Sequence, residues 1–243
     1  MRPIIVIPTR LASTRLPRKA LLDINGLTMI ERVIHRALAA DLGPVILASG
    51  DREIIKAVSH IKAVNCVLTD PELPSGSDRV WAALERCDPE RYYDVVINLQ
   101  GDLPFINPSH LGLVLKPLEK EEVSIGTLVA PITDPEEARM ASVVKVACSF
   151  SGESAIARAL YFSRQSIPWG DGPLWHHVGL YAWRREALGH FVSLPPSHLE
   201  QREKLEQLRA LEDGMVIGCC SIEEAPIGVD VEEDLIMARA RVS

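Results

Sequence analysis

The chain has 243 residues, enough for one large domain or for one domain with an additional lobe. Apolar residues make up 47% of the chain and charged residues 24%, which excludes extensive disorder. No apolar run approaches the roughly 18 residues that span a membrane. The first apolar run, 4–7, is also too short for a signal peptide. We therefore expect no membrane insertion.

The net charge of −7 argues against nucleic acid as a partner, because no overall positive field attracts the phosphate backbone. The five cysteines form an odd set without a C-x-x-C pair, which is typical of a reducing compartment, so we expect a cytoplasmic protein. The positive charge is concentrated at one end. The first 22 residues contain Arg2, Arg10, Arg15, Arg18 and Lys19 and no acidic residue. This segment is suited to binding a small anion, and a solvated basic face is the alternative.

Short apolar runs alternate with helical patterns through the first half of the chain. Strands are predicted at 4–7, 45–48, 66–68, 94–99 and 123–129, and helices at 29–38, 52–59, 79–85 and 109–118. The predicted strands are almost continuously apolar, which indicates a parallel sheet covered by helices on both faces. The sequence therefore predicts an α/β fold with a Rossmann-like, mostly parallel sheet.

The alternation breaks between about 143 and 183, where loops rich in Gly, Pro and Trp separate the apolar runs. Strands are predicted there at 143–148, 155–162 and 178–183, followed by a helix at 199–213, a strand at 216–221 and a helix at 231–241. We interpret 143–183 as a small antiparallel lobe of a single domain that covers 1–243.

The loop after the first predicted strand, 8–19, is rich in cations. It offers three hydroxyls, three arginines and one lysine but no glycine, so it is not a P-loop. Arginine forms paired hydrogen bonds to phosphate oxygens, and lysine supplies a mobile point charge. Open α/β sheets bind ligands at the carboxyl ends of their strands. The loop is therefore predicted to bind phosphate groups through its side chains.

Two aspartates lie beside predicted elements: one follows a core strand and the other precedes the last helix. Asp102 comes after 94–99 by way of Gln100-Gly101, and Asp230 ends the run Gly228-Val229-Asp230. Mg²⁺ usually binds one or two carboxylates together with phosphate oxygens. Taken alone, Gly-Asp is a common turn, and the local sequence favours Asp230 as the N-cap of the last helix. Together with the basic loop, the two carboxylates indicate a site for a metal ion and a nucleotide.

Several longer motifs extend across nearly the whole chain. They are Ile7-Pro8-x-Arg10 with Ala12-Ser13-Thr14-Arg15-Leu16-Pro17-x-Lys19, Asp23-Ile24-Asn25-Gly26, Ser75-Gly76-Ser77-Asp78-Arg79, Asn98-x-Gln100-Gly101-Asp102, Val143-x-Lys145-Val146, Tyr161-Phe162-Ser163-Arg164 with Ile167-Pro168-Trp169, His177-x-Gly179-x-Tyr181, Leu205-Glu206-Gln207-Leu208-Arg209 and Gly228-Val229-Asp230. Through them the chain resembles the nucleotide-sugar cytidylyltransferases, above all the CMP-Kdo synthetases, which activate 3-deoxy-D-manno-octulosonate (Kdo) with CTP.

This resemblance implies a nucleotide-diphospho-sugar transferase fold and transfer of CMP from CTP to the anomeric hydroxyl of Kdo, for lipopolysaccharide biosynthesis. It also implies Mg²⁺ as cofactor and a homodimer, with 143–183 serving sugar binding and dimerisation. The implied catalytic residues are Lys19, Arg15, Asp102 and Asp230, of which the two aspartates hold the metal. The implied nucleotide-binding residues are Pro8, Thr9, Arg10, Ser13, Thr14, Ser75, Arg79 and Gln100. The implied sugar-binding residues are Gln100, Arg164, His177, Tyr181, Glu206 and Gln207.

Two positions depart from the family pattern: Arg18 stands where Gly is usual and Leu103 where Glu is usual. We expect Arg18 to add charge to the basic loop and Leu103 to remove a carboxylate beside the metal site. Taken alone, Glu206 and Gln207 are interpreted as part of the solvent-exposed face of a helix.

Three other functions remain as alternatives: a cytidylyltransferase for sialic acid or 8-amino-Kdo, a pyrophosphorylase that uses UTP or GTP, and an inactive nucleotide-binding regulator on the same fold.

Overall fold

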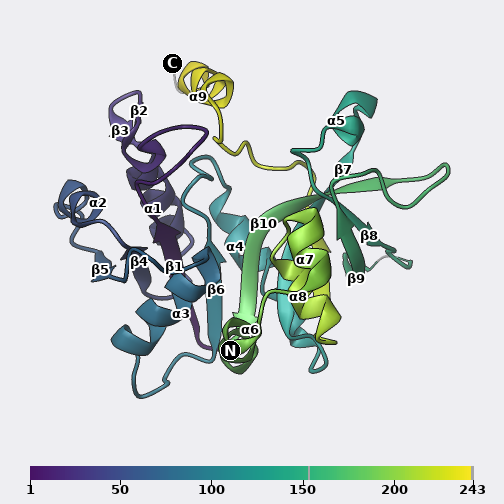
Figure 1. Ribbon diagram of the computed structural model, residues 1–243, viewed down its shortest axis with the longest axis horizontal. Coiled ribbons are helices and arrows are strands. Elements are labelled where there is room, and N and C mark those ends of the chain that lie inside the picture. Colours follow the sequence, from purple (N-terminus) through teal and green to yellow (C-terminus); the bar gives the residue numbers. More distant parts are fainter. Residues whose placement is uncertain (153, 242–243) are drawn as a thin grey trace. The chain divides into compact units, whose positions relative to one another are not determined.

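The protein is described here by a computed structural model, in which residues 1–152 and 154–241 are described. The chain forms two compact units (Figure 1). The first unit contains Met1–Leu111 and the C-terminal segment Pro226–Ser243, and the second contains Gly112–Ala225. Among the described residues, no helix is both long and apolar enough to cross a membrane.

A four-stranded parallel sheet forms the centre of the first unit, with the strand order β5-β4-β1-β6. These strands are β1 (Pro3–Thr9), β4 (Val45–Ser49), β5 (Val64–Leu68) and β6 (Val95–Leu99). Every residue of β4 and β6 is buried. Continuous burial of this kind is expected when both faces of a parallel sheet are covered, and it confirms the parallel sheet predicted for this part of the chain.

Helices and a hairpin complete the first unit. They are η1 (Lys19–Leu21), β2 (Asp23–Ile24), β3 (Leu27–Thr28), α1 (Met29–Ala39), α2 (Arg52–Ala57), α3 (Gly76–Cys87), α4 (Pro108–Leu113, ending in the second unit) and α9 (Glu232–Ala240). Helix α1 begins at a capping box, in which Thr28 and Glu31 each bond the backbone amide of the other. The C-terminal helix α9, yellow in Figure 1, packs against β2. The end of the chain thus returns to the segment that follows the basic loop.

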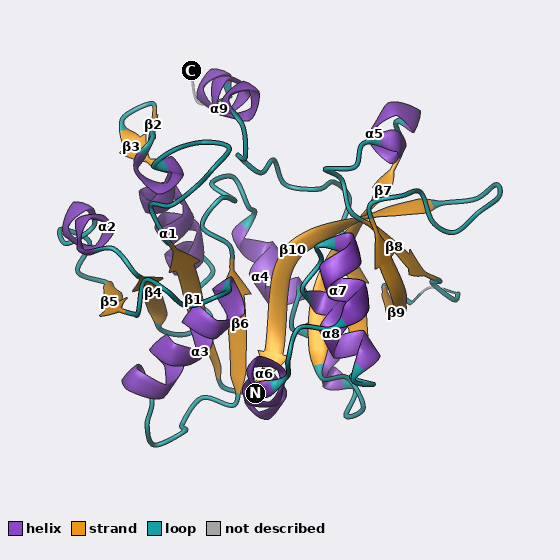
Figure 2. Ribbon diagram, in the orientation of Figure 1, coloured by secondary structure: helices purple, strands orange, loops and turns teal. Residues whose placement is uncertain are grey.

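The second unit contains a mixed sheet with the strand order β10-β7-β11-β9-β8 (Figure 2). Its elements are η2 (Lys116–Glu119), β7 (Ile125–Ile132), α5 (Pro135–Arg139), β8 (Lys145–Cys148), β9 (Ile156–Ser163), β10 (Leu174–Arg184), α6 (Arg185–Ser193), α7 (His198–Glu203), α8 (Gln207–Glu212) and β11 (Ile217–Ser221). Strand β11 runs parallel to β7, and the other pairings are antiparallel.

The single long helix expected at 199–213 is wrong. The chain forms two short helices there, because Lys204 adopts a left-handed conformation (φ 57°, ψ 48°) that ends α7. Leu205 then turns into the core, and the carboxylate of Glu200 on α7 binds the guanidinium of Arg209 on α8 at 2.6 Å. This ion pair and the buried leucine hold the two helices together.

Candidate active site

The basic loop between β1 and η1 is fixed at two points. The backbone amide of Leu11 donates to Oδ2 of Asp51 at 2.8 Å, at the start of α2. Leu16 is buried in an apolar cluster with Val229 and Leu235 from the C-terminal segment. These two contacts hold the loop in place, and its arginines Arg10, Arg15 and Arg18 are exposed.

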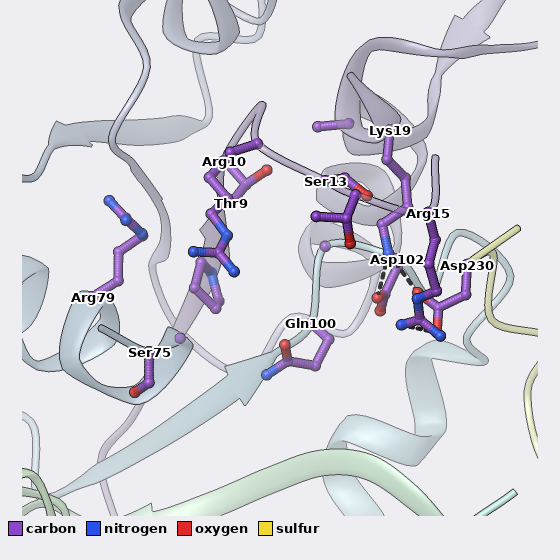
Figure 3. Close-up of a pocket in the computed structure, with 16 residues that line it drawn as sticks. Thr9, Arg10, Ser13, Arg15, Lys19, Ser75, Arg79, Gln100, Asp102 and Asp230 are labelled. Atoms are coloured by element: carbon purple, nitrogen blue, oxygen red, sulfur yellow. Dashed lines mark hydrogen bonds and ion pairs between the residues drawn. The ribbon is translucent and has the colours of Figure 1, made fainter. Parts of the chain in front are cut away.

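At the end of this loop, one ammonium group lies between two carboxylates (Figure 3). Nζ of Lys19 is 2.8 Å from Oδ2 of Asp102 and 2.8 Å from Oδ1 of Asp230. Nη2 of Arg15 is 3.1 Å from the other oxygen of Asp230. A backbone hydrogen bond of 3.0 Å from the amide of Val229 to the carbonyl of Asp102 brings the two carboxylates side by side.

The alternative interpretation of Asp230 as the cap of the last helix is wrong. The carboxylate of Asp234 accepts the backbone amides of Asp230 and Val231, at 2.8 and 3.0 Å, and takes that role at the start of α9. The carboxylate of Asp230 is left to face the basic loop. Burial alone raises the pKa of Asp230, but Lys19 and Arg15 outweigh burial and hold the pKa below its ordinary value.

Lys19 is charged in this cluster. Burial alone lowers its pKa, but the carboxylates of Asp102 and Asp230 outweigh burial and raise the pKa above its ordinary value. Its side chain is 18% exposed, against 62% for Arg15. The positive charges of Lys19 and Arg15 together balance the negative charges of Asp102 and Asp230.

Arg79, on α3, lies at the other end of the site (Figure 3). Its guanidinium donates to the hydroxyl of Thr69 and to the backbone carbonyls of Asp70 and Pro71. A Cβ at Gly50 would come within 2.8 Å of its Nη1, so only glycine allows this approach. Burial, and next the charge of Arg10, lower the pKa of Arg79. Contacts with the described residues use three of its five N–H donors, and the other two are available to a ligand.

Ser75 and Gln100 lie below these groups in Figure 3. Ser75 caps α3, since its hydroxyl accepts the amide of Asp78 and donates to the carboxylate of the same residue at 2.6 Å. Gln100 directly follows β6, and its amide nitrogen donates to Asn98 at 2.9 Å. The carbonyl oxygen of Gln100 is thereby directed away from the strand.

A single cavity of about 340 Å³ in the first unit joins these two ends. Its size is suitable for a small-molecule ligand. All residues predicted for the nucleotide, the catalysis and the metal line it: Pro8, Thr9, Arg10, Ser13, Thr14, Arg15, Lys19, Ser75, Arg79, Gln100, Asp102 and Asp230. Ala12, Ala20, Gly76 and Gly101 also line it and were not predicted, because residues without functional side-chain groups give no chemical signal.

The donor set at one end of the cavity fits a divalent cation. Among the described residues there is no cluster of three or more His, Cys, Asp or Glu that could hold a metal ion by itself. Asp102 and Asp230 do, however, direct one oxygen each at a common cation, the ammonium of Lys19. Two carboxylates that converge in this way, beside cations suited to phosphate, match the way in which Mg²⁺ is held jointly by protein and nucleotide.

In the second unit, His177 on β10 is buried, and its ring contacts a hydroxyl group on the neighbouring strand. Its Nε2 is 3.1 Å from the hydroxyl of Thr127 on β7. That hydroxyl donates its single proton to a carbonyl at the bulge of β10, Val178 at 3.1 Å or Leu180 at 2.9 Å. With that proton given to a carbonyl, we assign the ring proton of His177 to Nε2, which leaves Nδ1 as an acceptor. Burial, with a smaller contribution from His176, lowers the pKa of His177 to about 3.

Three further predicted residues of the second unit are buried or partly buried: Gln207, Tyr181 and Glu206. The ring of Tyr181 lies 5.5 Å from that of His177, and burial followed by the charge of Glu206 raises its pKa. Gln207 is 5% exposed, and within the described part of the chain its buried Nε2 has no hydrogen-bond partner. The interpretation of Glu206 and Gln207 as a solvent-exposed helix face is thus wrong, because the left-handed turn at Lys204 directs the start of α8 into the protein.

Arg164 ties three segments of the second unit together. Its Nε and Nη1 donate to the carbonyls of Glu203 and Ala141, both at 2.9 Å, and its Nη2 donates to that of Lys204 at 3.3 Å. Lys145 reinforces this junction from within the core: its fully buried ammonium bonds the carbonyl of Arg164 at 2.7 Å. Sequence reasoning found Arg164 but missed these supports, whose role depends entirely on tertiary contacts.

The two departures from the family pattern have clear positions. Arg18 adopts a left-handed conformation (φ 58°), which explains why Gly is usual at this position. Its guanidinium binds the carboxylate of Glu53 on α2 and does not line the cavity, so the charge that Arg18 adds to the basic loop is paired with Glu53. Leu103 is 7% exposed and lies near Gly228, where it packs as an apolar side chain.

Comparison with known proteins gives an independent result. The sequence profile described as "Cytidylyltransferase" matches residues 4–217. The 3-deoxy-manno-octulosonate cytidylyltransferase of Parvibaculum lavamentivorans is 52% identical, over 99% of this chain and 93% of that protein. The enzyme of the same name from Methylobacterium radiotolerans is 53% identical, over 98% of this chain and 96% of that protein.

A solved structure agrees with these relatives. It is described as CMP:2-keto-3-deoxy-manno-octonic acid synthetase complexed with CTP, and it superimposes with a TM-score of 0.88 at 35% identity. The match covers 100% of this chain and 98% of that one. The chain therefore belongs to the cytidylyltransferase family of nucleotidyltransferases and, within it, to the 3-deoxy-manno-octulosonate cytidylyltransferases.

Proposed function

We propose that this chain transfers CMP from CTP to the anomeric hydroxyl of Kdo, with release of pyrophosphate, in lipopolysaccharide biosynthesis. The observation that carries the proposal is the cavity in the first unit, where the basic loop, Arg79 and two convergent carboxylates meet. The α-phosphorus of CTP is attacked by the sugar oxygen, and the bond to the leaving pyrophosphate breaks. Such transfer depends mainly on positioning and charge neutralisation, both of which this cavity is built to supply.

The triphosphate is assigned to the end with the excess of mobile cations. Arg10, Ser13, Thr14, Arg15 and Lys19 line this part of the cavity and offer charged or hydroxyl donors to phosphate oxygens. Lys19 and Arg15 would stabilise the charge that develops on pyrophosphate as it leaves. The anchors at Leu11 and Leu16 keep this loop ordered before substrate binds, which lowers the entropic cost of binding.

The cytosine is assigned to the opposite end. This end offers donors and acceptors for the edge of a pyrimidine. They are the remaining N–H groups of Arg79, the backbone at Pro8–Thr9 and the hydroxyl oxygen of Ser75, which is an acceptor because its proton is donated to Asp78. The fixed guanidinium of Arg79, held by Thr69–Pro71, makes this end rigid. Rigid polar groups discriminate best, because a base of the wrong pattern leaves them unpaired.

Asp102 and Asp230 are the residues that would hold Mg²⁺. When bound, the ion would supply positive charge to the reacting phosphate and to the acidic sugar. The chain's own contribution is to place the two carboxylates together, through the backbone bond from Val229 to Asp102. Gln100 lies beside them at the end of β6 and is the first of the residues proposed for the sugar.

The other residues proposed for the sugar acid belong to the second unit. Arg164, His177, Tyr181, Glu206 and Gln207 offer a cation, acceptors and donors for a carboxylate and several hydroxyls. One observation supports a polar ligand there: among the described residues, the buried side-chain nitrogen of Gln207 has no hydrogen-bond partner. Buried polar groups are normally paired, so this N–H group is available to bind a hydroxyl group.

The proposal is tested by measuring pyrophosphate release from each of the four nucleoside triphosphates, with Kdo, 8-amino-Kdo and sialic acid as acceptors. We expect release with CTP and Kdo, and much slower release with sialic acid. Faster turnover with sialic acid or 8-amino-Kdo would move the assignment to that sugar. Absence of release with every pair, in folded protein supplied with Mg²⁺, would favour a nucleotide-binding regulator.

We further propose that the protein acts in the cytoplasm as a homodimer, with 143–183 at the interface. The side chains of Trp169 and Leu160 in this segment are 99% and 65% exposed. Exposed large apolar residues are suited to contact with a second chain. The cysteines among the described residues are all free thiols, which suits a reducing compartment.

A further inference from the structure

The carboxylates proposed for the metal are already neutralised by the protein itself. Lys19 bonds one oxygen of each, and Arg15 bonds the second oxygen of Asp230. Two positive and two negative charges balance within this cluster, at donor–acceptor distances of 2.8 to 3.1 Å. The ammonium of Lys19 therefore lies where both carboxylates converge, at the position that the proposed function gives to a divalent cation.

The proposed function assigns these four groups to two other tasks. Lys19 and Arg15 are needed at the triphosphate, and Asp102 and Asp230 at the divalent cation. Both sets of contacts cannot exist at once, because a divalent cation placed beside Lys19 and Arg15 would bring four positive charges against two negative ones. A triphosphate supplies the missing negative charge and alternative partners for both side chains.

We propose that Lys19 is an exchangeable counter-cation, which occupies the carboxylate pair until the nucleotide draws it away and thereby delays divalent-cation binding until CTP is present. This inference deepens the proposed function and rests on it. Lys19 keeps Asp102 and Asp230 together while no substrate is bound, and its departure exposes a preformed pair of carboxylates. The consequence is an order of binding, with nucleotide before the protein-held metal.

The local structure permits this exchange without movement of the loop. Leu16 and Leu11 hold the backbone on one side, and the 3₁₀ helix η1 holds it at Lys19 itself. Lysine carries a point charge on a flexible four-carbon stem, and rotation of that stem is enough to redirect the ammonium. Lys19 lines the same cavity as Arg10 and Thr14, so the phosphate groups would lie within the volume that its side chain borders.

Binding of Mn²⁺ to the nucleotide-free protein tests the inference, since the electron paramagnetic resonance signal of free Mn²⁺ falls as the ion is bound. Lys19→Met should raise the affinity for Mn²⁺ by roughly tenfold or more, because repulsion between a single and a double positive charge in contact is of this size even in water. Lys19→Arg, which keeps the charge, should remain close to wild type.

Two controls locate the effect. Lys62→Met removes an exposed lysine that bonds the carbonyl of Ser59 and lies outside the cavity, and it should leave Mn²⁺ affinity unchanged. The double variant Lys19→Met with Asp102→Asn should lose the gain. Equal affinity of wild type and Lys19→Met for Mn²⁺ would overturn the inference. So would a gain that survives Asp102→Asn, because the ion would then be bound elsewhere.

The wild-type protein provides a second test that does not depend on the stability of a variant. In protein labelled with ¹³C at the lysine ε-carbons, CTP in the presence of EDTA should shift the Lys19 resonance, and Mg²⁺ alone should not. A shift with Mg²⁺ alone would overturn the inference. The pyrophosphate assay tests the proposed function separately. Release of pyrophosphate with CTP and Kdo, but without the expected Mn²⁺ binding and lysine shifts, would contradict only the inference. The expected Mn²⁺ binding and lysine shifts without release of pyrophosphate would contradict only the proposed function.

Discussion

The buried His177 makes the stability of the second unit depend on pH. Its pKa is about 3 in the folded protein and 6.5 when unperturbed, so the folded state excludes a proton that the unfolded state binds. Stability rises with pH wherever the unfolded state binds more protons. The contribution of His177 is therefore fully present above about pH 6.5 and is lost as the pH falls toward about 3.

The size of this loss follows from the two pKa values. At pH 4.5 the unfolded side chain is protonated and the folded one is not, which costs about 2–3 kcal/mol relative to neutral pH. His177→Gln keeps an N–H donor for Thr127 but cannot be charged. This variant should be less stable than wild type at neutral pH, and the difference between the two should shrink by about 2–3 kcal/mol on acidification.

Urea unfolding followed by tryptophan fluorescence measures this difference, because Trp183 on β10 is buried close to the site. Carboxylates titrate in both proteins, so the informative quantity is the gap between the two curves and not either slope. His35→Gln, at an exposed position of α1, is the matched control and should follow wild type throughout. Parallel curves for wild type and His177→Gln between pH 4.5 and 7.5 would refute the reasoning.

Three further predictions concern activity and assembly. Asp102→Asn and Asp230→Asn should each lower kcat by about 100-fold or more at saturating Mg²⁺ without unfolding the protein, and near-normal turnover would remove that residue from the metal site. Lys19→Ala should depress kcat more than it raises KM for CTP, whereas Arg79→Ala should mainly raise that KM and relax the preference over UTP; steady-state kinetics with both nucleotides decides each. Light scattering should give a dimer mass, and a monomer mass at all concentrations would contradict the interface proposed at 143–183.

The parts of the site that follow from local sequence were predictable. A continuous apolar run indicates that β6 is buried, and the residue after it must then emerge at the carboxyl edge of the sheet, where Asp102 is found. The basic loop follows β1 for the same reason. Both positions could be predicted, because each depends on the end of a single strand.

Other features depend on contacts between distant segments, which a sequence pattern does not reveal. The orientation of Asp230 depends on whether Asp234 or Asp230 caps α9, and both are acidic residues in suitable positions. The break at Lys204 requires a left-handed lysine, for which propensity gives no signal. The proton on His177 is fixed by Thr127 on another strand. Each of these outcomes was open until the tertiary contacts were known.

Because the charges around Lys19 balance, a single substitution of Lys19 or Asp102 changes the net charge of the cluster as well as removing one side chain. Removing Lys19 leaves Asp102 and Asp230 facing each other with Arg15 alone to offset them, and removing Asp102 leaves Lys19 with one partner. Each single variant therefore combines the loss of a catalytic group with a new imbalance. Residues in one charge network deviate from additivity by about 0.5–3 kcal/mol. A double-mutant cycle over Lys19 and Asp102 separates the two effects, because the double variant removes one charge of each sign and leaves the cluster neutral.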